Sequence, residues 1–267
     1  MSPPPLKEAL STGAHKTQCF AISVLLLLCF RKLSMSFDYK HIQAATEEEF
    51  VSKSTELLEK AILDAIGKNG VCTLGLSGGS TPRATYTRLG ASKNIDWSAV
   101  AIFLVDERYV PPDHKESNAR LVRETLLHSA KIPENQIIFP EVTLPLDACV
   151  QRYEKRLAAL FRVGYPDVVL LGLGEDGHIA SLFPGDVDAL LERERNVLHT
   201  QTDHFAVRDR ITLTLPVLTS AETPLFLLKG EGKKKIFAET LSENTDPIEY
   251  PAHALLEAGR TVWVTCF

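Results

Sequence analysis

Asp176 and His178 stand two residues apart in a turn that follows a short apolar segment. That segment, residues 168–173, contains β-branched valines and predicts a strand buried on both faces. Gly172 and Gly174 punctuate its end. Ligands of open α/β sheets bind beyond the carboxyl ends of the strands, so an acid and an imidazole here indicate a site. Taken alone, the turn is more typical of an ordinary strand-to-helix connection, but two upstream segments favour a site.

The first upstream segment is a glycine-rich loop after an expected strand at residues 71–76. It reads Ser77, Gly78, Gly79, Ser80, Thr81 and Pro82. Two glycines let backbone amides approach a ligand closely. We expect Ser80 or Thr81 to cap a helix that begins at Pro82, and its N-terminus to attract an anion. The spacing of a P-loop or a dinucleotide fingerprint is absent, which disfavours those ligands. A purely structural turn is an equal alternative.

The second upstream segment is a charged triplet, Asp106, Glu107 and Arg108, directly after the apolar residues 100–105. If residues 100–105 form a parallel strand, the triplet lies at the same edge of the sheet as the glycine loop. A solvated charge cluster is the alternative, and the wholly apolar strand before it disfavours that interpretation.

Composition limits the kinds of function. The chain has 267 residues, 45% of them hydrophobic, and a net charge of −5. That length and hydrophobic content suffice for a substantial core, and the negative charge argues against nucleic-acid binding. The five cysteines include no C-x-x-C pair, which favours a reducing compartment without disulfides or a zinc site. No zinc site is therefore expected from the cysteines, and the chain is assigned no cofactor.

The N-terminal residues differ in composition from the rest. An apolar run at residues 21–30 is too short to span a bilayer, which needs about 20 residues. It is compatible with a signal peptide, but Arg31 and Lys32 occupy the expected cleavage region. Met35 is an alternative start. We expect residues 1–34 to be a leader outside the fold, residues 35–267 to be one domain, and membrane association to be absent.

Strands and helices alternate along the remaining sequence. This alternation predicts an α/β fold with a Rossmann-like, doubly wound, mostly parallel sheet flanked by helices. Asp147 is expected to cap a helix that runs to Phe161, and Lys233–Lys235 are expected to be solvated. The expected strands are residues 37–42, 71–76, 100–105, 137–139, 168–173, 211–215, 225–228 and 261–265. The expected helices are residues 46–66, 82 onward, 117–127, 147–161 and 233–241, and residues 187–191 are expected to form a short helix or a loop.

Four motifs in this order resemble the 6-phosphogluconolactonase family over residues 37–265: SGGSTP at 77–82, DER at 106–108, GLGEDGHIASLFP at 172–184 and RITLTLP at 210–216. The resemblance implies a fold shared with glucosamine-6-phosphate deaminases and ribose-5-phosphate isomerases. It also implies a cytoplasmic, metal-independent enzyme of the pentose phosphate pathway that hydrolyses 6-phospho-D-glucono-1,5-lactone. We expect a monomer or a weak oligomer.

Lactone opening needs a base, a nucleophilic water and a donor for the oxyanion. His178 suits the base because imidazoles titrate near neutral pH. Asp176 is expected to orient the ring, and the fixed charge of Arg108 suits the oxyanion. The substrate and its phosphate are assigned to the following residues: Ser77, Gly78, Gly79, Ser80, Thr81, Asp106, Arg208, Arg210 and Lys229.

Three alternatives have different sequence signatures. Ser80 as a nucleophile lacks the G-x-S-x-G elbow. Related isomerases and deaminases resemble the chain around His178, but they carry a further Glu in an FNEP-like run and favour DEY. Here Ser181–Pro184 contain no carboxylate and residues 106–108 read DER. A non-catalytic sugar-phosphate sensor would add a helix-turn-helix module, and the 34-residue leader is too short and too apolar for one.

Overall fold

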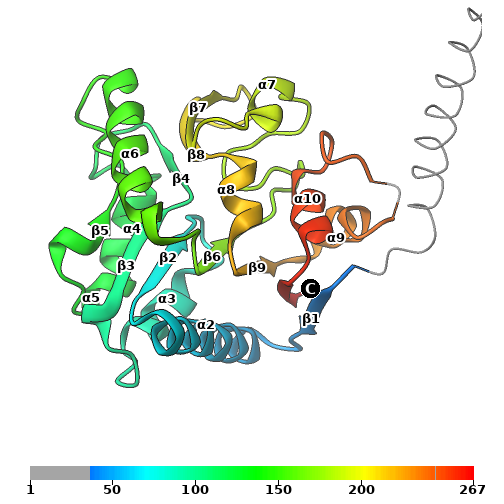
Figure 1. The fold of residues 1–267 in the computed structure, drawn as a ribbon. Coiled ribbons are helices and arrows are strands. Elements are labelled where there is room, and N and C mark those ends of the chain that lie inside the picture. The colour runs from blue at the N-terminus through cyan, green and yellow to red at the C-terminus, as the bar shows by residue number, and fades with distance from the viewer. Residues whose placement is uncertain (1–36, 244) are drawn as a thin grey trace, which may run out of the picture. The chain divides into compact units, whose positions relative to one another are not determined.

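A parallel seven-stranded sheet organises the chain (Figure 1). The computed structural model describes residues 37–243 and 245–267, and residues 38–267 form one compact unit. The expected leader lies outside the described residues. The strand order is β1-β10-β9-β6-β2-β3-β5, and all neighbouring strands pair in parallel. The strands are β1 (Tyr39–Gln43), β2 (Cys72–Leu76), β3 (Val100–Leu104), β5 (Ile137–Ile138), β6 (Val168–Leu171), β9 (Thr223–Lys229) and β10 (Thr261–Cys266).

Helices cover both faces of this sheet, as a doubly wound fold requires. On one face, strand residues such as Leu74 and Ile102 join a buried cluster with Leu58 and Ile62 of α2 and residues from α3, α4 and α5. On the other face, Phe103 meets Phe161 edge to face at 5.5 Å. The helices are α2 (Glu47–Asn69), α3 (Arg83–Gly90), α4 (Asn118–Glu124), α5 (Leu126–Ser129), α6 (Leu146–Leu160), α7 (Val187–Leu191), α8 (Leu215–Ser220), α9 (Lys234–Thr240) and α10 (Pro251–Ala258). The predicted α/β fold is confirmed.

Helix ends follow their local sequence only in part. The Thr46 hydroxyl accepts a hydrogen bond from the Glu49 backbone at the start of α2, and Gly70 ends that helix in the left-handed conformation. The predicted caps of two other helices are wrong. Helix α3 has Pro82 at its N-cap without a side-chain cap, so neither Ser80 nor Thr81 caps it. Helix α6 begins one residue before Asp147, which lies in its first turn.

The chain also forms a second, antiparallel sheet of three strands. The sequence predicts only one of them as a strand, at residues 211–215. The second sheet consists of β4 (Asp106–Arg108), β8 (Asp209–Leu213) and β7 (Val197–Gln201), in that order. The charged triplet therefore forms a short strand of its own, in which Arg108 pairs directly opposite Arg210. Strand β7 and helix α10 were not predicted.

The direction of strand succession reverses between β2 and β6. From β2 the chain continues to β3 and β5 on one side, whereas β6, β9 and β10 follow one another on the other side. Open α/β sheets bind ligands at such a switch point, outside the carboxyl ends of the strands. The glycine loop follows β2 and the His178 turn follows β6, so the two candidate segments flank this point.

Candidate active site

A cavity of about 570 Å³ lies at the carboxyl ends of β2, β6 and β9. It brings together 11 of the 12 predicted site residues, while Arg208 lies elsewhere. The 11 are Ser77, Gly78, Gly79, Ser80, Thr81, Asp106, Arg108, Asp176, His178, Arg210 and Lys229. Further residues of the lining include Glu175, His204, Phe205 and Lys233.

The turn that carries His178 is tightly closed. The Gly174 backbone N–H donates to the His178 carbonyl at 2.8 Å, and the Gly177 N–H donates to the Gly174 carbonyl at 3.1 Å. Gly177 has a φ of +92°, a conformation that favours glycine. A Cβ atom on Gly174 would lie 2.2 Å from Nδ1 of His178 and 2.3 Å from Oδ1 of Asp176. Glycine at 174 is therefore what allows these two side chains to meet.

Asp176 and His178 form a hydrogen-bonded pair. Oδ1 of Asp176 lies 2.5 Å from Nδ1 of His178 and also accepts the His178 backbone N–H at 3.3 Å. Burial raises the pKa of Asp176, but the hydrogen bonds and the charge of His178 outweigh that effect, and the pKa lies below its ordinary value. The Asp176 carboxylate is therefore the hydrogen-bond partner of Nδ1. Among the described residues, no side chain or backbone group bonds to Nε2. Nε2 is the nitrogen available to a ligand.

Aromatic rings confine the imidazole. The ring of Phe183 lies 5.2 Å from that of His178, and Phe205 meets it edge to face at 5.4 Å. Phe205 also lies under the Arg210 guanidinium, at 5.6 Å. Phe205 was not singled out from the sequence, because a lone Phe in a loop carries no motif.

The glycine loop is anchored to the first turns of α3. The Tyr86 hydroxyl donates to the Ser77 carbonyl at 2.7 Å, and both residues are buried. Gly79 has a φ of +87° and an added Cβ there would meet none of the described atoms within 4 Å, whereas Gly78 is packed closely against Asn118. The loop thus has one fixed glycine and one that allows a left-handed bend.

Four basic and three acidic side chains line the cavity, so its formal charge is positive although the chain as a whole carries −5. The basic ones are Arg108, Arg210, Lys229 and Lys233, and the acidic ones are Asp106, Glu175 and Asp176. Burial lowers the pKa of Arg210, as does the charge of Arg108. Two guanidinium groups this close indicate a place for an anion.

Lys233 corrects a prediction, because it is not a solvated lysine. Its Nζ donates to the Leu173 carbonyl and lines the cavity. Burial lowers its pKa, partly offset by the charges of Glu175 and Asp176. Its position shortly after the carboxyl end of β9 is a sequence feature that could have indicated a role in the site. The feature was overlooked because Lys233 begins a run of three lysines, which is typical of a solvated surface.

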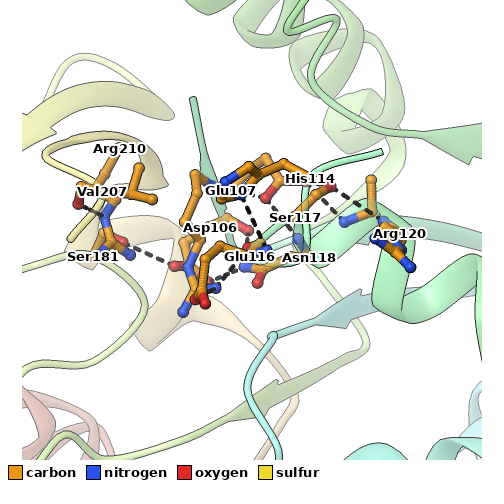
Figure 2. A network of polar contacts seen from close by, with 12 residues as sticks. Asp106, Glu107, His114, Glu116, Ser117, Asn118, Arg120, Ser181, Val207 and Arg210 are labelled. Atoms are coloured by element: carbon orange, nitrogen blue, oxygen red, sulfur yellow. Dashed lines mark hydrogen bonds and ion pairs between the residues drawn. The ribbon is translucent and has the colours of Figure 1, made fainter. Parts of the chain in front are cut away.

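Two predicted substrate residues have different surroundings from those expected. Both carboxylate oxygens of Asp106 accept hydrogen bonds from protein groups, Oδ1 from Asn118 at 3.1 Å and Oδ2 from Ser181 at 2.8 Å (Figure 2). Arg208 does not reach the cavity. Its Nε lies 3.3 Å from Asp203, and the residue lines a separate depression of about 420 Å³.

Within residues 37–243 and 245–267, no group of three His, Cys, Asp or Glu side chains is arranged to hold a metal ion. Among the helices of the same residues, none combines the length and hydrophobicity that a bilayer crossing requires.

The model of a family described as glucosamine-6-phosphate isomerases/6-phosphogluconolactonase matches residues 45–263. The chain belongs to this family. Its matched region contains all residues that line the cavity. Among curated members of the family, the chain is 37% identical over 218 residues to the Dictyostelium discoideum protein named "Probable 6-phosphogluconolactonase", covering 80% of this chain and 92% of that protein.

A second similar protein is the 6-phosphogluconolactonase of Synechocystis sp., 36% identical over 209 residues, which cover 76% of this chain and 85% of that protein. Among solved structures, the 6-phosphogluconolactonase from Plasmodium vivax superposes with a TM-score of 0.79 at 28% identity, covering 91% of this chain and 95% of that one.

Proposed function

We propose that the chain hydrolyses 6-phospho-D-glucono-1,5-lactone to 6-phospho-D-gluconate, the lactonase reaction of the pentose phosphate pathway. The observation that carries the proposal is the Asp176–His178 pair, which leaves Nε2 of the imidazole available in a cavity with an excess of positive charge. An ester with a phosphate at its far end needs both features, a base near the carbonyl and cations for the phosphate.

The first step is the attack of water on the lactone carbonyl carbon. Nε2 of His178 removes a proton from the water while the new C–O bond forms, and the carbonyl electron pair moves onto oxygen. Asp176 stabilises the imidazolium that results, because its carboxylate accepts a hydrogen bond from the Nδ1–H group. The Arg108 guanidinium lines the cavity and stabilises the oxyanion.

The second step is the collapse of the tetrahedral intermediate. The carbonyl re-forms, the bond to the ring oxygen breaks, and His178 returns its proton to that oxygen. The product is an open-chain hydroxy acid, and the imidazole is neutral again. No acyl-enzyme forms, so a serine nucleophile such as Ser80 is not needed.

The phosphate is bound by the glycine loop and by cations of the cavity wall. Backbone amides around Gly79 and the N-terminus of α3 donate to the phosphate oxygens. Arg210, Lys229 and Lys233 supply the positive charge. Lys229 also pairs with Glu47 at 2.8 Å, so part of its positive charge is already compensated by a carboxylate.

The isomerases and deaminases that this chain resembles carry a further Glu shortly after the histidine. In this chain the corresponding residues include Ser181, which is buried and bonded to Asp106, and the apolar Leu182 and Phe183. The absence of a carboxylate from residues 181–184 of the sequence supports the lactonase reaction.

The experiment compares three substrates with the purified chain: 6-phosphogluconolactone, unphosphorylated gluconolactone and glucosamine 6-phosphate. Spontaneous lactone hydrolysis is measured without enzyme and subtracted. We expect fast hydrolysis of the phosphorylated lactone, weak hydrolysis of the other lactone and no ammonia from the amino sugar. Ammonia release without lactone turnover would support the deaminase instead. We place the reaction in the cytoplasm, which cell fractionation would test.

A further inference from the structure

Asn118 touches two parts of the site without lining the cavity. It is the first residue of α4 and is 1% exposed. Its Nδ2 donates to the Asp106 carbonyl at 2.8 Å and to the Asp106 carboxylate at 3.1 Å. Its Oδ1 is buried and has no hydrogen-bond partner among the residues that the structure describes, and it lies where a Cβ on Gly78 would come within 1.7 Å. The Asn118 side-chain amide therefore holds Asp106 by hydrogen bonds and packs against Gly78 of the glycine loop.

Asp106 continues this connection to the loop after His178. The Ser181 hydroxyl donates to Oδ2 of Asp106 at 2.8 Å, and Ser181 is fully buried three residues after His178. The backbone of Ser181 is held as well, by its N–H to Thr212 at 3.1 Å and by its carbonyl from Thr200 at 2.8 Å. Figure 2 shows Asn118, Asp106 and Ser181, which are linked by hydrogen bonds. Because Asn118 packs against Gly78, these three residues form a buried polar bridge between the glycine loop and the His178 turn.

Glu107 holds the Asn118 end of this bridge in place. Its two carboxylate oxygens accept the backbone N–H groups of Asn118 at 2.7 Å and Ala119 at 2.8 Å, and also the Ser117 hydroxyl at 3.1 Å. The start of α4 cannot shift without breaking these bonds.

The main sheet does not make this connection itself. Strands β2 and β6 pair only through Leu74–Gly75 and Val168–Val169, so their backbone ladder ends before either loop begins. A substrate with a reacting group at one end and a phosphate at the other needs its two anchors at a fixed separation.

We propose that Asn118 is a positioning residue that, through Asp106 and Ser181, fixes the glycine loop relative to the His178 turn. The proposal rests on the proposed function, since it concerns the distance between the bound phosphate of the substrate and the His178 base. Its consequence is that the gain in turnover that a phosphate group brings depends on Asn118 and Ser181, two residues outside the cavity lining.

The test is a double-mutant cycle between Gly78 and Asn118. The readout is the ratio of kcat/KM for phosphorylated lactone to that for unphosphorylated gluconolactone. We expect Asn118→Ala and Gly78→Ala each to lower this ratio roughly 10-fold or more, because one loosens the loop and the other forces it away from the amide. In the double variant the alanine at 118 removes the clashing amide, so we expect it to be no worse than Asn118→Ala alone. Effects that multiply, or an unchanged ratio, would overturn the proposal.

A second variant tests the far end of the bridge if Asn118→Ala does not fold. Ser181→Ala removes one hydroxyl and keeps the backbone bonds, and it should lower the same ratio. The matched control is Ser54→Ala, which also removes a fully buried hydroxyl but one bonded to Phe50, Val51 and Thr85. We expect Ser54→Ala to lower the melting temperature and leave the ratio unchanged. Equal effects of both serine variants on the ratio would overturn the proposal.

Binding separates this proposal from the proposed function. Calorimetry gives the affinities for 6-phosphogluconate and for gluconate without any turnover, and their ratio should fall in Asn118→Ala and in Ser181→Ala. If the wild type hydrolysed no lactone but the binding ratio still fell, the proposed reaction would be wrong and the bridge would stand. An unchanged binding ratio in an active enzyme would overturn the bridge alone.

Discussion

At the scale of single residues, the two nitrogens of one imidazole have different surroundings. Nδ1 of His178 is taken by Asp176, and Nε2 is available in the cavity. We predict that His178→Asn lowers kcat by roughly 10²–10⁴-fold, the usual contribution of a positioned base. Binding of 6-phosphogluconate should persist, because the glycine loop and the lysines are unchanged.

The assay for His178→Asn must subtract spontaneous lactone hydrolysis, which proceeds without enzyme. Steady-state rates give kcat, and calorimetry gives the affinity for 6-phosphogluconate. Retention of most of the activity after this correction would contradict the assignment of His178 and would move the base to Asp176. Loss of product binding together with kcat would indicate a collapsed site instead.

The same scale shows which site residues a sequence can reveal. Asp176 and His178 were found because type and spacing together suggest chemistry. Lys233 was missed because charge alone does not say which of three consecutive lysines turns inward, and the structure shows Nζ bonded to the Leu173 carbonyl. Arg208 was included because it lies two residues before Arg210, but it precedes β8 and its Nε lies 3.3 Å from Asp203.

At the scale of elements, the turn after β6 depends on a missing side chain. We predict that Gly174→Ala lowers kcat by at least 10-fold, because its Cβ would lie 2.2 Å from Nδ1 of His178 and 2.3 Å from Asp176. The pair would have to separate, which removes the orientation of the imidazole. The affinity for 6-phosphogluconate should change little, since the phosphate contacts lie on other loops.

The control for this turn is Gly67→Ala in helix α2, where an added Cβ meets nothing within 4 Å. Kinetics of both variants should show a loss of kcat for Gly174→Ala only. Normal turnover in Gly174→Ala would mean that the turn relaxes without cost and that the Asp176–His178 contact is dispensable.

Elements differ in how far the sequence predicts them. The interior parallel strands were predicted because they are buried and read as apolar runs between turn residues, whereas the edge strand β1 is mostly exposed. Strand β7 was missed because it reads VLHTQ, with exposed His199 and Gln201, and lacks an apolar run. Strand β4 consists of three charged residues, and only its pairing with the distant β8 makes it a strand.

At the scale of the whole molecule, the charge of the cavity is opposite in sign to the net charge of the chain. The chain carries −5, but the residues that line the cavity include four basic and three acidic side chains. Two of these acids are bonded within the site, Asp106 to Asn118 and Ser181, and Asp176 to His178. The cavity of this acidic protein is therefore locally positive and attracts a phosphorylated substrate. The negative net charge of the chain disfavours nucleic-acid binding.

The stability of the whole molecule should depend on pH through Glu107. This carboxyl group is 1% exposed, and burial raises its pKa to about 7, against the hydrogen bonds that Asn118, Ala119 and Arg108 donate to it. The folded protein therefore binds the Glu107 proton more tightly than the unfolded chain does. Its contribution to the free energy of unfolding is fully present below about pH 4.5 and is lost as the pH rises to about 7.

We predict that the wild type loses stability relative to Glu107→Gln between pH 5 and pH 8. The glutamine does not titrate, so any fixed cost of its amide is the same at both pH values and cancels in the comparison. A shift from 4.5 to about 7 corresponds to a change on the order of 3 kcal/mol in the free energy of unfolding. Urea unfolding of both proteins at several pH values gives this difference directly. If the difference stayed constant from pH 5 to pH 8, Glu107 would be ionised in the folded protein throughout, and the four hydrogen bonds that it accepts would outweigh its burial.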